Sequence, residues 1–86
     1  MKIDTELEVK KIVAEVGECE IEEVDLDANI YSELGIDSLK AIEISVMVEK
    51  KFKIAIRGEQ IASIITARNI LNLVKKALKN KGKKKK

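Results

Sequence analysis

The stretch LGIDSLKAIEISVMVEKKF, residues 34–52, decides how this chain folds. The carboxylate of Asp37 can cap a helix start, and the residues after it are apolar at helical spacing. We therefore predict a helix that runs from Ser38 to about Lys51. One stripe of this helix is assigned to the core: Ala41, Ile44 and Val48, continuing toward Phe52. Ser38 then stands at the positive end of the helix, where unpaired backbone N–H groups and the helix dipole favour phosphate.

A second apolar stripe lies on the serine's own side of this helix. Ile42 and Val46 follow Ser38 by one and two turns. Apolar groups beside an accessible serine suit a docking surface for another protein. The alternative is that both residues are buried, because a helix that is apolar all round usually lies in a core. The chain contains no histidine, so we interpret Ser38 as a residue that is modified rather than as a nucleophile.

The rest of the chain predicts a small all-α protein. Apolar residues at helical spacing predict a first helix over residues 4–16, capped by Asp4 or Thr5. A short helix near residues 59–64 follows the Arg57-Gly58 turn, and Thr66 can cap a last helix that runs through Leu78. Residues 17–37 predict a long loop that inserts aliphatic side chains between the helices, namely Ile21, Val24, Leu26, Ile30 and Leu34. The expected architecture is a four-helix bundle with three longer helices, one short one and a long loop between the first two.

The composition describes one small domain with a basic end. Apolar residues make up 45% of the 86 residues, but only Tyr31 and Phe52 are aromatic, so the core is aliphatic and its net stability is about 3–5 kcal/mol. The single cysteine, Cys19, excludes an internal disulfide and a multi-cysteine zinc site. No apolar run has the length of a membrane span, and we expect a cytoplasmic protein. Residues 1–78 hold 11 basic and 15 acidic side chains, whereas residues 79–86 predict a disordered basic tail.

The motif Gly35-Ile36-Asp37-Ser38-Leu39 resembles the G-x-D-S-L signature of the acyl carrier proteins. Other family-like positions run from about Thr5 to Val74: Val9-Lys10-Lys11-Ile12, Glu22-Glu23-Val24, Glu33-Leu34, Glu43, Phe52, Ile56, Ile64 and Thr66. The resemblance implies a carrier that holds acyl intermediates as thioesters on a 4′-phosphopantetheine arm attached to Ser38. It implies a role in fatty-acid, polyketide or related lipid biosynthesis, and no enzymatic activity.

The resemblance also implies roles for individual residues. Those read by a phosphopantetheinyl transferase and by partner enzymes are Asp37, Leu39, Ile42, Glu43 and Val46. Those that line the acyl pocket are Ile44, Val48, Phe52, Ile56 and Ile64. The implied partners are this transferase, acyl-transferring, ligase and synthase enzymes, and the acyl chain itself. The implied carrier is monomeric, holds no metal, binds no nucleic acid and does not associate stably with membranes.

Lysines near the motif depart from typical fatty-acid carriers, which are acidic along this helix. Lys40 directly follows the signature, and Lys50, Lys51 and Lys53 close the helix. Rim charges govern partner choice, so we expect a specialised carrier rather than a housekeeping one. Two alternatives stay open. One is an aminoacyl, peptidyl or D-alanyl carrier, although Ile36-Asp37 favours acyl cargo. The other is an unmodified helical adaptor whose basic tail binds nucleic acid or an anionic membrane.

Overall fold

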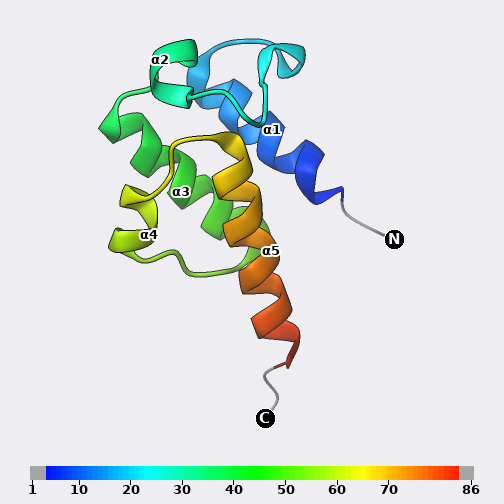
Figure 1. Ribbon diagram of the computed structural model, residues 1–86. Helices are drawn as coiled ribbons and strands as arrows, with labels where there is room; N and C mark the ends of the chain where they lie inside the picture. Colours follow the sequence, from blue (N-terminus) through cyan, green and yellow to red (C-terminus); the bar gives the residue numbers. More distant parts are fainter. Residues whose placement is uncertain (1–3, 84–86) are drawn as a thin grey trace.

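The computed structural model describes the backbone of residues 4–83 and the side chains of residues 4–79. Three long helices, α1 (Thr5–Gly17), α3 (Ser38–Phe52) and α5 (Ala67–Lys83), form the body of the molecule (Figure 1). Three short elements lie in the connections, namely the 3-10 turn η1 (Ile21–Glu23), α2 (Ile30–Leu34) and α4 (Gly58–Ala62). The predicted all-α class is confirmed, because residues 4–83 contain no strand and only an isolated bridge between Asn29 and Thr66.

The connection between α1 and α3 is more ordered than the sequence predicts. Within the segment expected to be a long loop, the structure has η1 and α2, so the architecture gains a second short helix. The Asn29 side-chain oxygen caps α2 by accepting the N–H groups of Tyr31 at 2.8 Å and Ser32 at 3.1 Å. Gly35 ends it with a φ of 66°, a left-handed conformation that favours glycine. The Asn29 cap and the left-handed Gly35 define the two ends of α2. With five residues, α2 is too short to show a repeating apolar pattern in the sequence.

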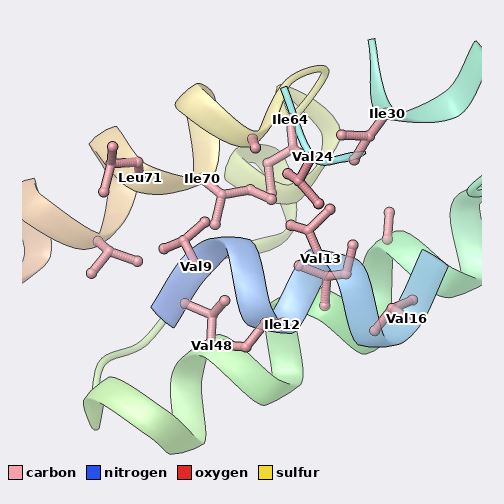
Figure 2. Packing of buried hydrophobic residues seen from close by; sticks show 14 of the residues in the cluster. Val9, Ile12, Val13, Val16, Val24, Ile30, Val48, Ile64, Ile70 and Leu71 are labelled. Carbon is pink, nitrogen blue, oxygen red and sulfur yellow. The ribbon is translucent and has the colours of Figure 1, made fainter. Parts of the chain in front are cut away.

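The core is formed by aliphatic side chains from all three long helices. Figure 2 shows Val9, Ile12, Val13 and Val16 of α1 packed between the buried residues of α3 and those near α5. Val9 and Val13 are completely buried. The stripe predicted for α3 is confirmed, because Ala41, Ile44, Val48 and Phe52 are all at most 6% exposed.

Several contacts tie the α1–α3 connection to the segment before α5. Val24 and Ile30 are buried, as expected for side chains inserted between helices. The Ile30 N–H donates to the Ile65 carbonyl at 2.9 Å, and the Tyr31 hydroxyl donates to the Ile64 carbonyl at 2.9 Å. Arg68 donates to both carboxylate oxygens of Asp27, at 2.6 and 3.2 Å. This guanidinium lowers the pKa of the Asp27 carboxyl.

The last helix begins as predicted and continues further than predicted. The Thr66 hydroxyl accepts the Asn69 N–H at 3.1 Å, which confirms it as the cap. The helix then extends to Lys83, beyond the end at Leu78 that the sequence predicts. The division into a domain and a basic tail from residue 79 stays a prediction. Residues 84–86 of the predicted tail lie outside the described residues. Within residues 4–83, no helix has the length and apolar character needed to cross a membrane.

Candidate functional site

Ser38 is the first residue of α3, and its side chain is exposed. Asp37 precedes the helix, and its Oδ1 accepts the Lys40 N–H at 2.9 Å, which confirms the predicted cap. The Asp37 carbonyl accepts the first helical bond, from the Ala41 N–H at 2.9 Å. The N–H groups of Ser38 and Leu39 lie in the first turn, where the helix itself provides no acceptor. An anion on the Ser38 oxygen would therefore be favoured by the helix terminus.

A fixed turn presents this serine to the solvent. Gly35 takes the left-handed conformation that ends α2, and its N–H donates to the Ile30 carbonyl. Ile36 then points into the core and is only 2% exposed. The end of α1 packs closely against this turn, since a Cβ at Gly17 would lie 3.7 Å from the Ile36 Cδ1 atom. The turn is anchored by a buried side chain on one side of Ser38, while Ser38 itself points outward.

The groups around Ser38 can hold a modification but cannot activate the hydroxyl. The chain has no histidine, and the neighbouring Asp37 uses one carboxylate oxygen for the helix cap. Lys40 lies 3.9 Å from Glu18 in a partly exposed ion pair. No group of three or more metal-ligating His, Cys, Asp or Glu side chains occurs in the part of the chain that the structure describes. The site therefore suits transfer of a group to Ser38 by another protein that supplies the base.

An exposed apolar patch continues from the serine along α3. We define the apolar patch as Leu39, Ile42 and Val46, which are 71%, 47% and 41% exposed. Glu43 is exposed beside it. The alternative in which Ile42 and Val46 are core residues is therefore wrong. The structure places all four side chains on the surface that leads away from Ser38, but their role in partner recognition stays a prediction.

The five residues predicted to line an acyl pocket all belong to the core. Ile44, Val48, Phe52, Ile56 and Ile64 are between 0 and 9% exposed and form part of one continuous buried cluster. They come from α3, the α3–α4 connection and the segment before α5. The structure thus brings these five side chains together in the core, whereas Ser38 is exposed at the start of α3. An acyl chain would have to displace contacts that these side chains already make, and the pocket stays a prediction.

Two residues that position the site were not identified from the sequence. Ile36 occupies the variable place in the motif, and its apolar character was a signal for the burial that the structure shows. Glu49 directly precedes Lys50 and Lys51 near the end of α3, and its Oε2 atom accepts the Ile56 N–H at 2.7 Å. This bond fixes the chain after α3 and with it the buried Ile56. Nothing local in the sequence indicates a bond between residues seven positions apart.

Comparison with known proteins gives consistent matches over most of the chain. The family model described as phosphopantetheine attachment site matches residues 8–74. The acyl carrier protein of Rickettsia bellii (strain RML369-C) is 32% identical over 75 residues, covering 86% of this chain and 87% of that protein. The polyketide-8 synthase acyl carrier protein 2 of Streptomyces avermitilis is 30% identical over 67 residues, covering 78% of this chain and 77% of that one. The crystal structure of an acyl carrier protein from Thermotoga maritima superposes with a TM-score of 0.73 at 27% identity, covering 85% of each chain.

Proposed function

The chain belongs to the acyl carrier proteins, which hold acyl groups as thioesters on a covalent 4′-phosphopantetheine arm, and we propose that this arm is attached to Ser38. It is therefore a carrier rather than an enzyme, and it interacts with acyl-handling enzymes. One observation carries the proposed attachment point. Ser38 is an exposed serine at the capped start of a long helix, inside the region that matches the family model, residues 8–74.

The surroundings of Ser38 fit a phosphodiester. Its hydroxyl is accessible, and the first-turn N–H groups of Ser38 and Leu39 together with the helix dipole favour the added negative charge. When bound, the arm supplies the thiol that forms the thioester with the acyl group. The chain supplies a fixed position for the arm, because the Gly35 turn and the buried Ile36 hold the start of α3. A phosphopantetheinyl transferase has to supply the base and the metal.

We propose that this transferase and the later partner enzymes bind the surface beside Ser38. Its apolar part is the apolar patch defined above, and its polar part is Asp37 and Glu43. Three exposed aliphatic side chains in a row along one helix are a recognisable contact for a partner protein. Since Asp37 also caps α3, its replacement would affect both the helix start and recognition. The cytoplasmic location and the monomeric state expected from the sequence stay predictions.

We also propose that the acyl chain is sheltered among Ile44, Val48, Phe52, Ile56 and Ile64. A thioester is reactive toward water, so burial of the chain beside apolar groups would slow its hydrolysis. The core is small and almost entirely aliphatic, and aliphatic side chains can change rotamer without breaking hydrogen bonds. Its total stability of about 3–5 kcal/mol also sets a low cost for partial opening. These properties support a core that accepts a chain between α3 and the segment before α5.

Attachment is tested by intact mass. The purified protein is incubated with coenzyme A, magnesium and a broad-specificity phosphopantetheinyl transferase. We expect one added phosphopantetheine in the wild type and none in Ser38→Ala. Two matched controls, Ser32→Ala and Ser63→Ala, replace other exposed serines and should be loaded like the wild type. Loading of Ser38→Ala, or no loading under conditions that modify a control carrier, would refute the proposal, provided that circular dichroism shows the helices intact.

A further inference from the structure

Charge is divided along this chain. Residues 12–39, which we call the acidic segment, hold nine acidic side chains and no basic ones, whereas residues 60–86 hold nine basic side chains and no acidic ones. The acidic segment runs from α1 through α2 to the start of α3, and the basic residues are those of α5 and the chain after it. Figure 1 shows that the last turns of α5 project from the body at the end opposite to α2. The acidic segment and Ser38 therefore lie far from the end of α5.

The lysines of α5 begin where its contribution to the core ends. We define the basic end of α5 as residues 75–83, which directly follow the completely buried Val74. Lys75, Lys76 and Lys79 are exposed, and their intervals of one, three and four residues place them on one side of the helix, away from Val74. None of the three takes part in the ion pairs found among the described side chains, residues 4–79.

Neither the fold nor the family accounts for this concentration of lysines. Cations in the last turn of a helix compensate its dipole, which corresponds to about half an elementary charge. Residues 75–86 hold eight lysines, far more than the dipole requires. The match to the family model ends at residue 74, so the resemblance to other carriers implies no role for the residues that follow. The basic end of α5 is therefore a surface without an assigned partner.

The acidic body of the molecule opposes binding to an anionic surface, because residues 1–74 hold 15 acidic and nine basic side chains. The shape of α5 reduces this repulsion. The nine residues of its basic end span about 13 Å at 1.5 Å per residue, which exceeds the Debye length of about 8 Å at physiological ionic strength. Glu8, at the start of α1, is paired with Lys51 at 3.2 Å. The exposed Glu43 lies in the second turn of α3, toward the end that carries Ser38.

We propose that the basic end of α5 binds the surface of a membrane that contains anionic lipids. Lysine acts there as a point charge beside lipid phosphates and needs no shaped site. Proteins that bind nucleic acid commonly add arginine forks or aromatic platforms. The last arginine of this chain, Arg68, is bound to Asp27, and no aromatic residue follows it. Binding is electrostatic and reversible, and it leaves Ser38 at the far end of the molecule. It goes beyond the proposed function and does not depend on the arm.

The test is co-sedimentation of the full, unmodified chain with lipid vesicles. One set of vesicles contains phosphatidylglycerol and phosphatidylcholine in equal parts, and the other contains phosphatidylcholine alone. Binding is measured at about 0.1 M NaCl and again at about 0.5 M NaCl, where exposed charges are screened. The test variant removes three charges from the basic end of α5, K75Q/K76Q/K79Q. The matched control removes three charges from lysines that the body holds in ion pairs, K10Q/K11Q/K40Q. Circular dichroism verifies that both variants are folded.

The wild type should bind the vesicles that contain phosphatidylglycerol but not those of phosphatidylcholine alone, and the higher salt concentration should release it. The test variant should bind at least about tenfold more weakly, because each lysine near an anionic lipid surface strengthens binding by about fivefold. The control should lose less than about twofold, since its lysines are outside the basic end. The proposal is overturned if the wild type does not distinguish the two kinds of vesicle, or if the control loses as much binding as the test variant.

Two other anionic partners give outcomes of their own, and both overturn the proposal. A duplex DNA or RNA that the wild type binds while it leaves the anionic vesicles unbound would assign the basic end to nucleic acid. Self-association without vesicles, seen by analytical ultracentrifugation and abolished in the test variant, would pair the basic end with the acidic segment of a second copy of this chain.

Discussion

Replacing Glu18 with glycine should make this protein more stable, although it removes an ion pair. Glu18 ends α1 with a φ of 57° and a ψ of 49°, in the left-handed region. This conformation allows the Cys19 N–H to reach the Ala14 carbonyl at 3.0 Å and closes the end of the helix. A residue with a Cβ adopts it at a cost of about 1–2 kcal/mol, which glycine does not incur.

The opposing terms are smaller. Glycine has more freedom in the unfolded chain, which costs about 0.5–1 kcal/mol. The ion pair that is lost has an Nζ–Oε2 distance of 3.9 Å between side chains that are 37% and 81% exposed, so its contribution is about 0.3 kcal/mol. The net expectation for Glu18→Gly is a gain of about 0.5 kcal/mol in the free energy of unfolding. For a domain of this size that corresponds to a Tm increase of about 2–4 °C.

The control variant is Glu18→Ala. It removes the same carboxylate and the same ion pair but keeps a Cβ in the left-handed conformation. Urea unfolding of both variants at pH 7 therefore isolates the backbone effect, and we expect the glycine variant to be more stable than the alanine variant by about 1 kcal/mol. If the alanine variant equals or exceeds the glycine variant, the left-handed cap at residue 18 stores no strain and the reasoning is wrong.

Four further changes test other contacts. The Arg68 guanidinium lowers the pKa of the Asp27 carboxyl. The contribution of this pair to the free energy of unfolding is therefore present above the ordinary carboxyl pKa and is lost as pH falls through the lowered pKa. In urea unfolding, Asp27→Asn should destabilise the protein at pH 7 but not at pH 2. Tyr31→Phe removes the bond to the Ile64 carbonyl at 2.9 Å and should cost about 1 kcal/mol in the same assay; no loss would mean that this bond does not hold α2 in solution. The Ser45 hydroxyl donates to the Ile42 carbonyl at 2.7 Å, and this carbonyl also accepts a backbone bond within the helix. Ser45→Ala should therefore change the free energy of unfolding by less than about 0.5 kcal/mol. A larger loss would assign the hydroxyl a further partner. Among the described side chains of α5, which end at residue 79, Val74 is the last fully buried one. Deletion of residues 80–86 should therefore shift Tm by less than about 2 °C, and a large decrease would place the domain boundary later than residue 78.

The sequence predicted the helices whose start is marked by a side chain and whose length allows a stripe to repeat. Asp37 and Thr66 were recognised as caps, and Asp4 was named with Thr5 as the alternative; all three side chains accept a backbone N–H in the structure. The burial of α3 followed from spacing alone. α2 was missed because five residues contain little more than one turn, so no stripe can repeat within it. Its cap, Asn29, stands in a run of acids and aliphatic residues that reads equally well as a loop.

The site itself was predictable in part. The position of Ser38 followed from the motif and from the cap at Asp37, both of which are local in sequence. The contacts around the site are not local: Ile36, in the turn before Ser38, packs near the end of α1, and at the other end of α3 the Glu49 carboxylate accepts the Ile56 N–H. The direction in which each lysine of α3 points was also not predictable. Lys50 and Lys51 are adjacent in sequence and equal in charge, and only the position of Glu8 on a different helix separates them.

The same aliphatic residues serve the fold and the proposed acyl shelter, and this links stability to cargo. Ile44 and Val48 are completely buried without a ligand, and Phe52, Ile56 and Ile64 are nearly so, so each of them already contributes apolar burial to a stability of only a few kcal/mol. A chain that enters among them replaces contacts between side chains with contacts of its own, and little net apolar area is exposed. The attachment point proposed at Ser38 lies elsewhere, at the capped start of α3 after the Gly35 turn. The proposed shelter requires this separation, because the attachment point is then presented in one geometry to every partner while the core takes up an acyl chain and releases it.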